Sequence, residues 1–265
     1  MKLYALTIIA TLCFCASGLI PAAQCQQYAK PQVPPPTIGP ELPNLGYEFL
    51  IDETHDQKCR DYTNFVTAIY PVNTGSKALD NILAFKAKKF LQKYLDYKHP
   101  ACGNPIGLTV SEFLMTFEAH SPGKNYLSIL EHSMEFPAGY AHPWNRAKAN
   151  IFDLRTARVV KINQIFPNPK YLPILWETMY WRWCQLGFGT IPDHYDVSNH
   201  SCDGRPPSPP MASPQHLDVL GQVYLVPEGM IIRLDPPYHR SAGPQKITIN
   251  IGELQNMGAN MEFWE

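Results

Sequence analysis

The chain has 265 residues, 45% of them hydrophobic, and its 22 basic and 23 acidic side chains leave a formal net charge of −1. This length and apolar content suit one large or two small domains, and the near-neutral charge argues against the basic surface that nucleic-acid binding requires. The 26 prolines favour many turns and edge strands over a helical bundle.

The first 25 residues have the pattern of a secretory signal peptide. Lys2 precedes an apolar run from residue 3 to residue 20, and small residues follow before Cys25. Cleavage is expected after Ala23 or after Cys25. We therefore expect an exported protein, in the periplasm or outside the cell. The alternative is an uncleaved membrane anchor, since the run is near the lower length limit for a span.

Residues 26–45 are proline-rich and predict an extended linker ahead of the folded part. Four cysteines follow the signal and the linker: Cys59, Cys102, Cys184 and Cys202. In an exported chain they indicate disulfides. Three connectivities are open, and we favour Cys59–Cys102 with Cys184–Cys202, because each pair joins segments within one half of the chain. A catalytic cysteine has no matching His and Asn pattern to support it.

The residue pattern in the first half of the folded part predicts a strand, a helix and a strand, followed by an antiparallel meander. Strands are expected at 47–51, 59–70 and 108–118, and helical spacing of apolar residues predicts a helix from Ser76 to Leu95. Residues 126–136 alternate apolar and polar side chains and predict another strand, which ends at Pro137 and Gly139. A second turn then leads to a short β run ending at Ile165 and Phe166. This order is typical of an α+β fold.

The second half predicts a helix and three more strands. The helix covers residues 171–186, a hairpin joins 222–226 to 230–234 through Pro227-Glu228-Gly229, and a strand covers 246–251. The fold class expected is therefore α+β, with antiparallel sheets, helices packed on one face and two sequential modules. We place the boundaries at 46–167 for the N-terminal module and 168–265 for the C-terminal one.

Two sequence patterns resemble one bacterial family, that of the extracellular domain of the anti-sigma factor RsiV and its secreted relatives. The run Gly139-Tyr140-Ala141-His142-Pro143, followed by Phe152-Asp153-Leu154, is similar to the family's "GAHP … FDL-x-x-G" core. The second pattern is similar to the family's C-terminal signature. It comprises Gly229 to Leu234, Asp235 to Tyr238, Ala242-Gly243-Pro244, Ile247 to Ile251 and Glu253-Leu254. The strand ending at Tyr70-Pro71 and the helix holding Asn81-Ile82 also resemble the N-terminal module that accompanies this domain in the family.

The resemblance implies a binding module of the cell envelope. The outer domain of RsiV senses lysozyme by binding it, so the resemblance implies a lysozyme-like protein or peptidoglycan as the partner. The anti-sigma role is not expected, because only Met1 and Lys2 precede the apolar run. Candidate binding residues lie in the turn 139–144, the loop 193–203 and the segment 238–240. They are Tyr140, His142, Trp144, Tyr238, His239 and Arg240.

Catalytic motifs are missing from the sequence: it has no Gly-x-Ser-x-Gly elbow, no His-Glu-x-x-His helix and no Gly-rich phosphate loop. We therefore expect that the protein is not an enzyme and that it uses no cofactor. The alternative is a metal-dependent cell-wall hydrolase or deacetylase. Its candidate groups are Asp193, His194 and His200 around a metal, His142 paired with Asp153, or a carboxylate pair among Glu131, Glu135 and Asp153.

Overall fold

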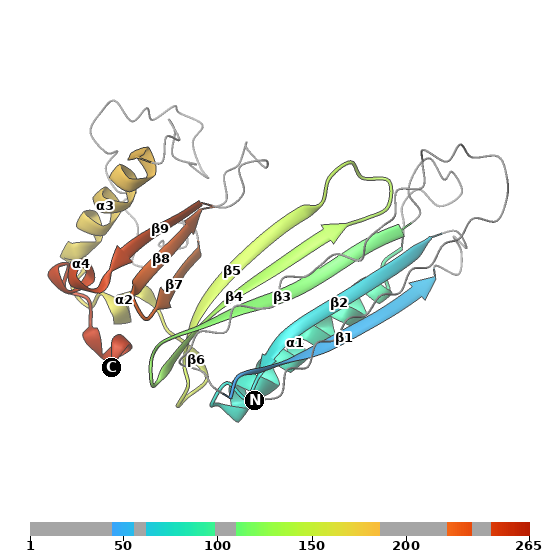
Figure 1. Cartoon of the computed structure of the whole chain (residues 1–265), viewed down its shortest axis with the longest axis horizontal. Coiled ribbons are helices and arrows are strands. Elements are labelled where there is room, and N and C mark those ends of the chain that lie inside the picture. Colours follow the sequence, from blue (N-terminus) through green and yellow to red (C-terminus); the bar gives the residue numbers. More distant parts are fainter. Residues whose placement is uncertain (1–43, 56–61, 99–109, 186–221, 235–244) are drawn as a thin grey trace, which may run out of the picture. The chain divides into compact units, whose positions relative to one another are not determined.

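The computed structural model describes residues 44–55, 62–98, 110–185, 222–234 and 245–265. All of these lie in one compact unit, residues 36–265. The expected signal peptide and nearly all of the expected linker lie outside the described residues. The fold is α+β with mostly antiparallel sheets, which confirms the fold class expected from the sequence (Figure 1). None of the helices in the described ranges is both long and apolar enough to cross a membrane.

The first sheet has six strands in the order β1-β2-β3-β4-β5-β6. Their bounds are β1 Gly46–His55, β2 Thr63–Val72, β3 Val110–Gly123, β4 Tyr126–Phe136, β5 Trp144–Asp153 and β6 Arg158–Val159. All neighbours are antiparallel except β2 and β3. That pair is parallel because helix α1, Lys77–Leu95, carries the chain back between them.

Helix α1 covers one face of this sheet. Its apolar residues recur at helical spacing, and Leu79, Leu83, Phe90 and Tyr94 are buried against the sheet. The ring of Tyr94 stacks on Phe113 of β3 with the centroids 4.2 Å apart. The sequence predicted this helix and its buried face correctly.

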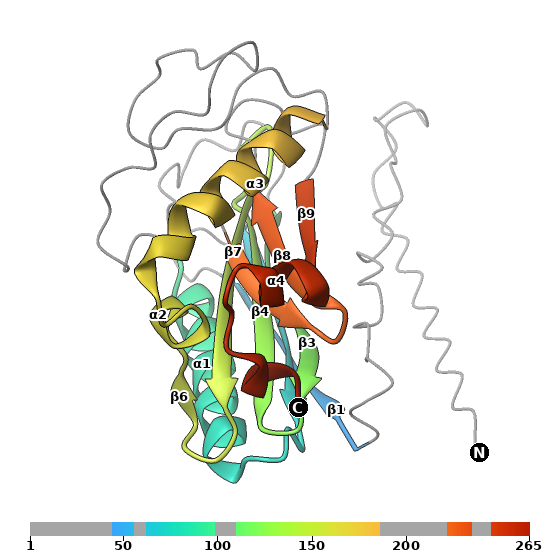
Figure 2. The same ribbon diagram turned by 90° about the vertical axis from the view of Figure 1, so that its left-hand side faces the viewer.

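The second sheet has three antiparallel strands, β7 Gln222–Val226, β8 Gly229–Leu234 and β9 Gln245–Asn250. Helices α2 Ile162–Ile165, α3 Leu172–Gln185 and α4 Ile251–Asn256 accompany it, with short 3-10 turns at Pro169–Tyr171 and Met261–Trp264 (Figure 2). The β7–β8 hairpin turns at Gly229, as the sequence predicts. A side chain there would place its Cβ 2.1 Å from the carbonyl oxygen of Ile249, so the turn requires glycine.

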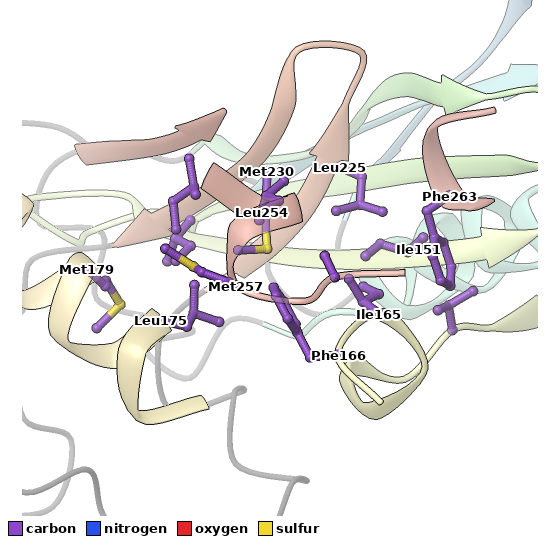
Figure 3. Packing of buried hydrophobic residues seen from close by; sticks show 14 of the residues in the cluster. Ile151, Ile165, Phe166, Leu175, Met179, Leu225, Met230, Leu254, Met257 and Phe263 are labelled. Atoms are coloured by element: carbon purple, nitrogen blue, oxygen red, sulfur yellow. The ribbon is translucent and has the colours of Figure 1, made fainter. Parts of the chain in front are cut away.

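The second sheet packs against the face of the first sheet that α1 leaves uncovered. Alternate residues of β4 face opposite sides, so Leu127 and Ile129 pack with α1 while Leu130 packs with Tyr224 and Val226 of β7. A larger apolar core holds α3, α4 and the second sheet together with Ile151 of β5 (Figure 3). Buried side chains from both halves of the chain thus form continuous cores.

Two elements differ in type from the sequence predictions, and β1 and β3 extend past the predicted ends at residues 51 and 118. The β run expected to end at Ile165 and Phe166 is a strand only at Arg158–Val159, and residues 162–165 are helical. The expected strand over 246–251 ends at Asn250, and Ile251 begins α4. In both places a side chain caps the helix: Gln164 accepts from the Lys161 N–H at 2.7 Å, and Asn250 accepts from the Glu253 N–H at 3.0 Å. These local caps override the strand preference of the β-branched residues beside them.

Candidate functional site

The turn between β4 and β5 brings together two of the predicted binding residues. The rings of Tyr140 and Trp144 meet edge to face, with the centroids 4.9 Å apart, and the two side chains are 40% and 38% exposed. His142 lies between them in the chain and is also exposed. The turn therefore presents an aromatic pair to solvent at the first residue of β5.

The other predicted site residues lie outside the described residues. These are Tyr238, His239 and Arg240, the metal candidates Asp193, His194 and His200, and the cysteines Cys59, Cys102 and Cys202. Cys184 lies in α3. Over the described ranges, no group of three or more His, Cys, Asp or Glu side chains could hold a metal ion.

The suggested acid–base pair of His142 and Asp153 is wrong. His142 precedes Trp144, which pairs with Glu135, whereas Asp153 pairs with Tyr126 at the other end of the β4–β5 ladder. The length of β5, roughly 30 Å, separates them. Asp153 is instead held by Arg155, with Nη2–Oδ2 at 2.9 Å, and these hydrogen bonds lower the pKa of the Asp153 carboxyl.

The suggested carboxylate pair is wrong for a similar reason. Glu131 and Glu135 lie four residues apart on β4, roughly 13 Å along a strand, which is beyond the spacing that glycoside hydrolysis uses. Glu131 forms an ion pair with Lys86 at 2.6 Å, and Glu135 lies 3.9 Å from Lys93. Both carboxylates are therefore balanced by lysines of α1.

A groove of about 1180 Å³ runs along the outer edge of β5, and we name it the β5 groove. Residues 146–151 of β5 line it, together with Met115 of β3 and Glu131, Ser133 and Glu135 of β4. Phe90, Lys93 and Tyr94 of α1 lie along one side, and residues 159–163 with Gln222 and Val223 along the other. The volume is at or above the upper end of that of small-molecule sites, which suits a polymer segment. Sequence reasoning missed this groove, because its lining comes from segments far apart in the chain.

The charges that line the β5 groove are mainly positive. Its cations are Lys93, Arg146, Lys148 and Lys161, and its carboxylates are Glu131 and Glu135. The carboxylates already have the lysine partners given above. Within the part of the chain that the structure describes, Arg146, Lys148 and Lys161 form no ion pair. The groove thus carries an excess of positive charge and is suited to an acidic ligand.

The edge of β5 beside this groove is open for most of its length. Strand β6 pairs only with Phe152 and Asp153. The Ala149 N–H points outward, since it donates to Oε1 of Gln222 at 2.6 Å, and the Ile151 carbonyl accepts from the Val160 N–H at 2.7 Å. Toward Trp144, no described residue continues the ladder.

A second polar cluster joins the two sheets. His132 of β4 lies between Glu118 of β3, at 3.0 Å, and Arg233 of β8, at 2.8 Å. The imidazole of His120, 3.7 Å away, and the hydrogen-bonded imidazole of His132 hold the pKa of the Glu118 carboxyl well below its usual range. The hydroxyl of Tyr224 is buried beside them and has no hydrogen-bond partner within the described ranges, and burial raises its pKa to about 12. Glu118, His132 and Arg233 are engaged with one another, and we assign them to holding the sheets together.

Comparison with known proteins places the fold. No protein-family model matches the chain, and no curated protein matches it in sequence. Among solved structures, the chain is similar to a DUF3298 family protein from Pseudomonas aeruginosa PAO1. The two share 13% identity and a TM-score of 0.51, over 83% of this chain and 96% of that one. A DUF3298 family member from Bacteroides fragilis NCTC 9343 shares 18% identity and a TM-score of 0.46, over 83% of this chain and 95% of that one.

The likeness to the Pseudomonas protein shows a common fold. DUF3298 is related to RsiV-like domains, the family that the sequence patterns resemble. The chain therefore has the α+β fold of a DUF3298 protein, and its structural neighbours belong to a family of unknown function.

Proposed function

We propose that this chain is an exported, non-enzymatic binding module of the cell envelope, and that its β5 groove holds an acidic segment of its ligand. One observation carries the proposal: a groove of about 1180 Å³ with unpaired cations lies along an open strand edge. Strand edges and basic grooves are common sites of peptide recognition. The resemblance to the RsiV extracellular domain supports ligand recognition in the envelope.

Binding is favoured over catalysis by the ion pairs of three carboxylates, Glu131, Glu135 and Asp153. The two carboxylates in the groove form or approach ion pairs with Lys86 and Lys93, and Asp153 is bound by Arg155. A general acid or base needs a carboxyl group that can exchange a proton with the substrate. A carboxylate held by a cation at neutral pH is poorly suited to that role.

Export is part of the proposal and has its own test. Residues 1–25 have the order of a signal peptide, so the protein purified after secretion is expected to begin at Gln24 or Gln26. N-terminal sequencing measures this directly. Peptide mapping without reduction tests the favoured pairing of Cys59 with Cys102 and of Cys184 with Cys202. A secreted protein that still begins at Met1 would contradict cleavage.

The ligand is tested by calorimetric titration of the secreted protein with soluble peptidoglycan fragments and with a C-type lysozyme. Peptidoglycan stem peptides carry carboxylates and match the charge of the groove, and lysozyme is the ligand that the RsiV resemblance implies. Saturable binding at micromolar affinity, about −8 kcal/mol, or tighter is the expected result for one of them.

Matched variants decide whether the groove is the site. The double change Arg146→Ala with Lys148→Ala removes two groove cations, and it should weaken binding at least tenfold. Lys88→Ala with Lys89→Ala removes two exposed cations from α1 that do not line the groove, and it should leave the affinity within twofold. Equal effects of the two double changes would contradict the proposal.

A further inference from the structure

The backbone of β5 presents free hydrogen-bonding groups to the groove. In an antiparallel ladder, alternate residues direct both the N–H and the C=O away from the partner strand. Ala149 and Ile151 are of this kind, because their outward groups bond Gln222 and Val160. Asn145 and Ala147 lie in the same alternation. Both have outward N–H and C=O groups that no residue of the described ranges bonds.

The fold already places a strand on this edge farther along. Strand β6 pairs with Phe152 and Asp153, and the chain then turns away into α2 at Ile162. The line that β6 would follow if it continued runs beside residues 145–149, of which residues 146–149 line the groove. An added strand lies about 4.8 Å from its neighbour within the sheet, so it would lie in the groove beside these β5 residues.

The side chains along the edge define what such a strand must carry. Arg146 and Lys148 are exposed on the face that α1 covers, the face of Glu131 and Ile129. Ala147 and Ala149 lie on the opposite face, packed near Leu130 and Tyr224. Side chains on one face of paired strands contact each other, so a partner with acidic residues at alternate positions would meet the two cations. Its intervening positions would lie beside the alanines and are expected to be small or apolar.

We propose that an extended peptide segment of a partner, with acidic residues alternating with small apolar ones, adds as a strand to the outer edge of β5. This inference rests on the proposed function and specifies how the groove takes its ligand. Main-chain bonds to Asn145 and Ala147 supply the pairing, and Arg146 and Lys148 select the charge. Charged side chains on an edge strand also discourage pairing with other apolar strands. The same two cations thus exclude wrong partners and attract the acidic one.

The test uses a peptide of four Glu-Val repeats, blocked at both ends, titrated into the secreted protein at low salt. A Lys-Val peptide of the same length is the charge control. A Glu-Val peptide N-methylated at alternate residues is the backbone control, because it keeps every side chain and loses the donors. The Glu-Val peptide is expected to bind at least tenfold more tightly than either control. No binding of the Glu-Val peptide overturns the inference.

A protein variant separates strand addition from other modes of binding. Ala147→Pro removes the outward N–H without removing a bond to β4, and proline is tolerated at an edge strand of this kind. It should weaken binding of the Glu-Val peptide at least tenfold. Ala147→Val keeps the N–H and should change the affinity for this peptide less than threefold. Hydrogen exchange of the unaltered protein supplies a measurement that needs no variant. The Asn145 and Ala147 amides should exchange fast when free and be protected by the peptide.

The outcomes distinguish this inference from the proposed function. If a ligand binds and responds to Arg146 and Lys148 but not to Ala147→Pro or to N-methylation, the groove is the site and strand addition is wrong. Amides of Asn145 and Ala147 already protected in the free protein would also overturn the inference, since a segment of the chain itself would then occupy the edge. If no ligand responds to the cations, the proposed function fails as well.

Discussion

Arg233 of β8 donates a hydrogen bond to Nδ1 of His132 of β4 at 2.8 Å. Arginine has only donors, so the His132 nitrogen in this bond is the acceptor, and Nε2 of the same ring lies 3.0 Å from Glu118. The imidazole thereby links a carboxylate of the first sheet to a guanidinium of the second. Arg233 is only 8% exposed, so this link lies within the packing of the two sheets.

The Glu118 carboxylate is predicted to stabilise the fold above pH 5. Its pKa is lowered in the folded state, chiefly by the imidazole of His120 at 3.7 Å and by the hydrogen-bonded imidazole of His132. A lowered folded pKa means that this stabilisation is present above the unfolded pKa of about 4.3 and is lost as the pH falls below it. Glu118→Gln should therefore unfold at a lower temperature than the unaltered protein at pH 7. The difference between the two unfolding temperatures should become smaller below about pH 4 in thermal scans. A difference in unfolding temperature that grows on acidification would contradict the stabilising role of the Glu118 carboxylate.

Removing the Tyr224 hydroxyl is predicted to have little effect on the stability of the fold. This oxygen is buried without a hydrogen-bond partner among the described residues, so Tyr224→Phe should leave the free energy of unfolding unchanged or raise it by up to about 1 kcal/mol. Tyr126→Phe is the matched control. Its hydroxyl accepts from Arg155 at 3.1 Å and lies 3.2 Å from Glu262, so the change should cost about 1 kcal/mol. Denaturant unfolding measures both, and a larger loss in Tyr224→Phe would show that its hydroxyl has a partner.

Two glycines with positive φ are predicted to differ in their tolerance of alanine. Gly229→Ala would force a Cβ to 2.1 Å from a backbone oxygen at φ +150°, and it should destabilise the protein by more than about 3 kcal/mol. Gly139→Ala meets no atom within 4 Å and bears only the backbone cost of φ +81°, roughly 1 kcal/mol. Urea unfolding of both variants checks the order. Equal losses would contradict the steric account of the β7–β8 turn.

The ion pair of Lys86 with Glu131 is predicted to control the charge of the β5 groove. Lys86→Ala leaves the Glu131 carboxylate without its 2.6 Å partner, so an acidic peptide should bind several-fold more weakly. Glu131→Gln removes that negative charge and should strengthen binding several-fold. Titrations with the Glu-Val peptide measure both, with Lys88→Ala as the unaffected control. Stronger binding to Lys86→Ala and weaker binding to Glu131→Gln would show that the peptide lies elsewhere.

Most of the secondary structure could be predicted from local pattern. Strand β4 has the predicted bounds, and the helices near 77–95 and 172–185 lie where apolar spacing placed them. The two failures occurred where a short helix followed β-branched residues, at Ile162 and Ile251. Their capping residues, Gln164 and Asn250, are visible in the sequence, but the strand preference of the neighbouring residues was given more weight.

The predicted site was recovered only in part, for a physical reason. Tyr140 and Trp144 lie four residues apart across one turn, so a local motif brings them together. His142 and Asp153 also belong to one motif, yet an extended strand carries its ends apart by about 3.3 Å for each residue. Closeness in sequence does not place two side chains together when a strand lies between them.

The sequence by itself determined most of the helices and strands and the buried faces of α1 and β4, because period is a local property. Only the tertiary structure decided which strand edge stays open and which charges line it. The bond from Ala149 to Gln222 joins residues 73 apart, and the cations of the groove come from α1, β5 and the segment before α2. Pairing between distant segments brings these groups together, and no local pattern encodes it.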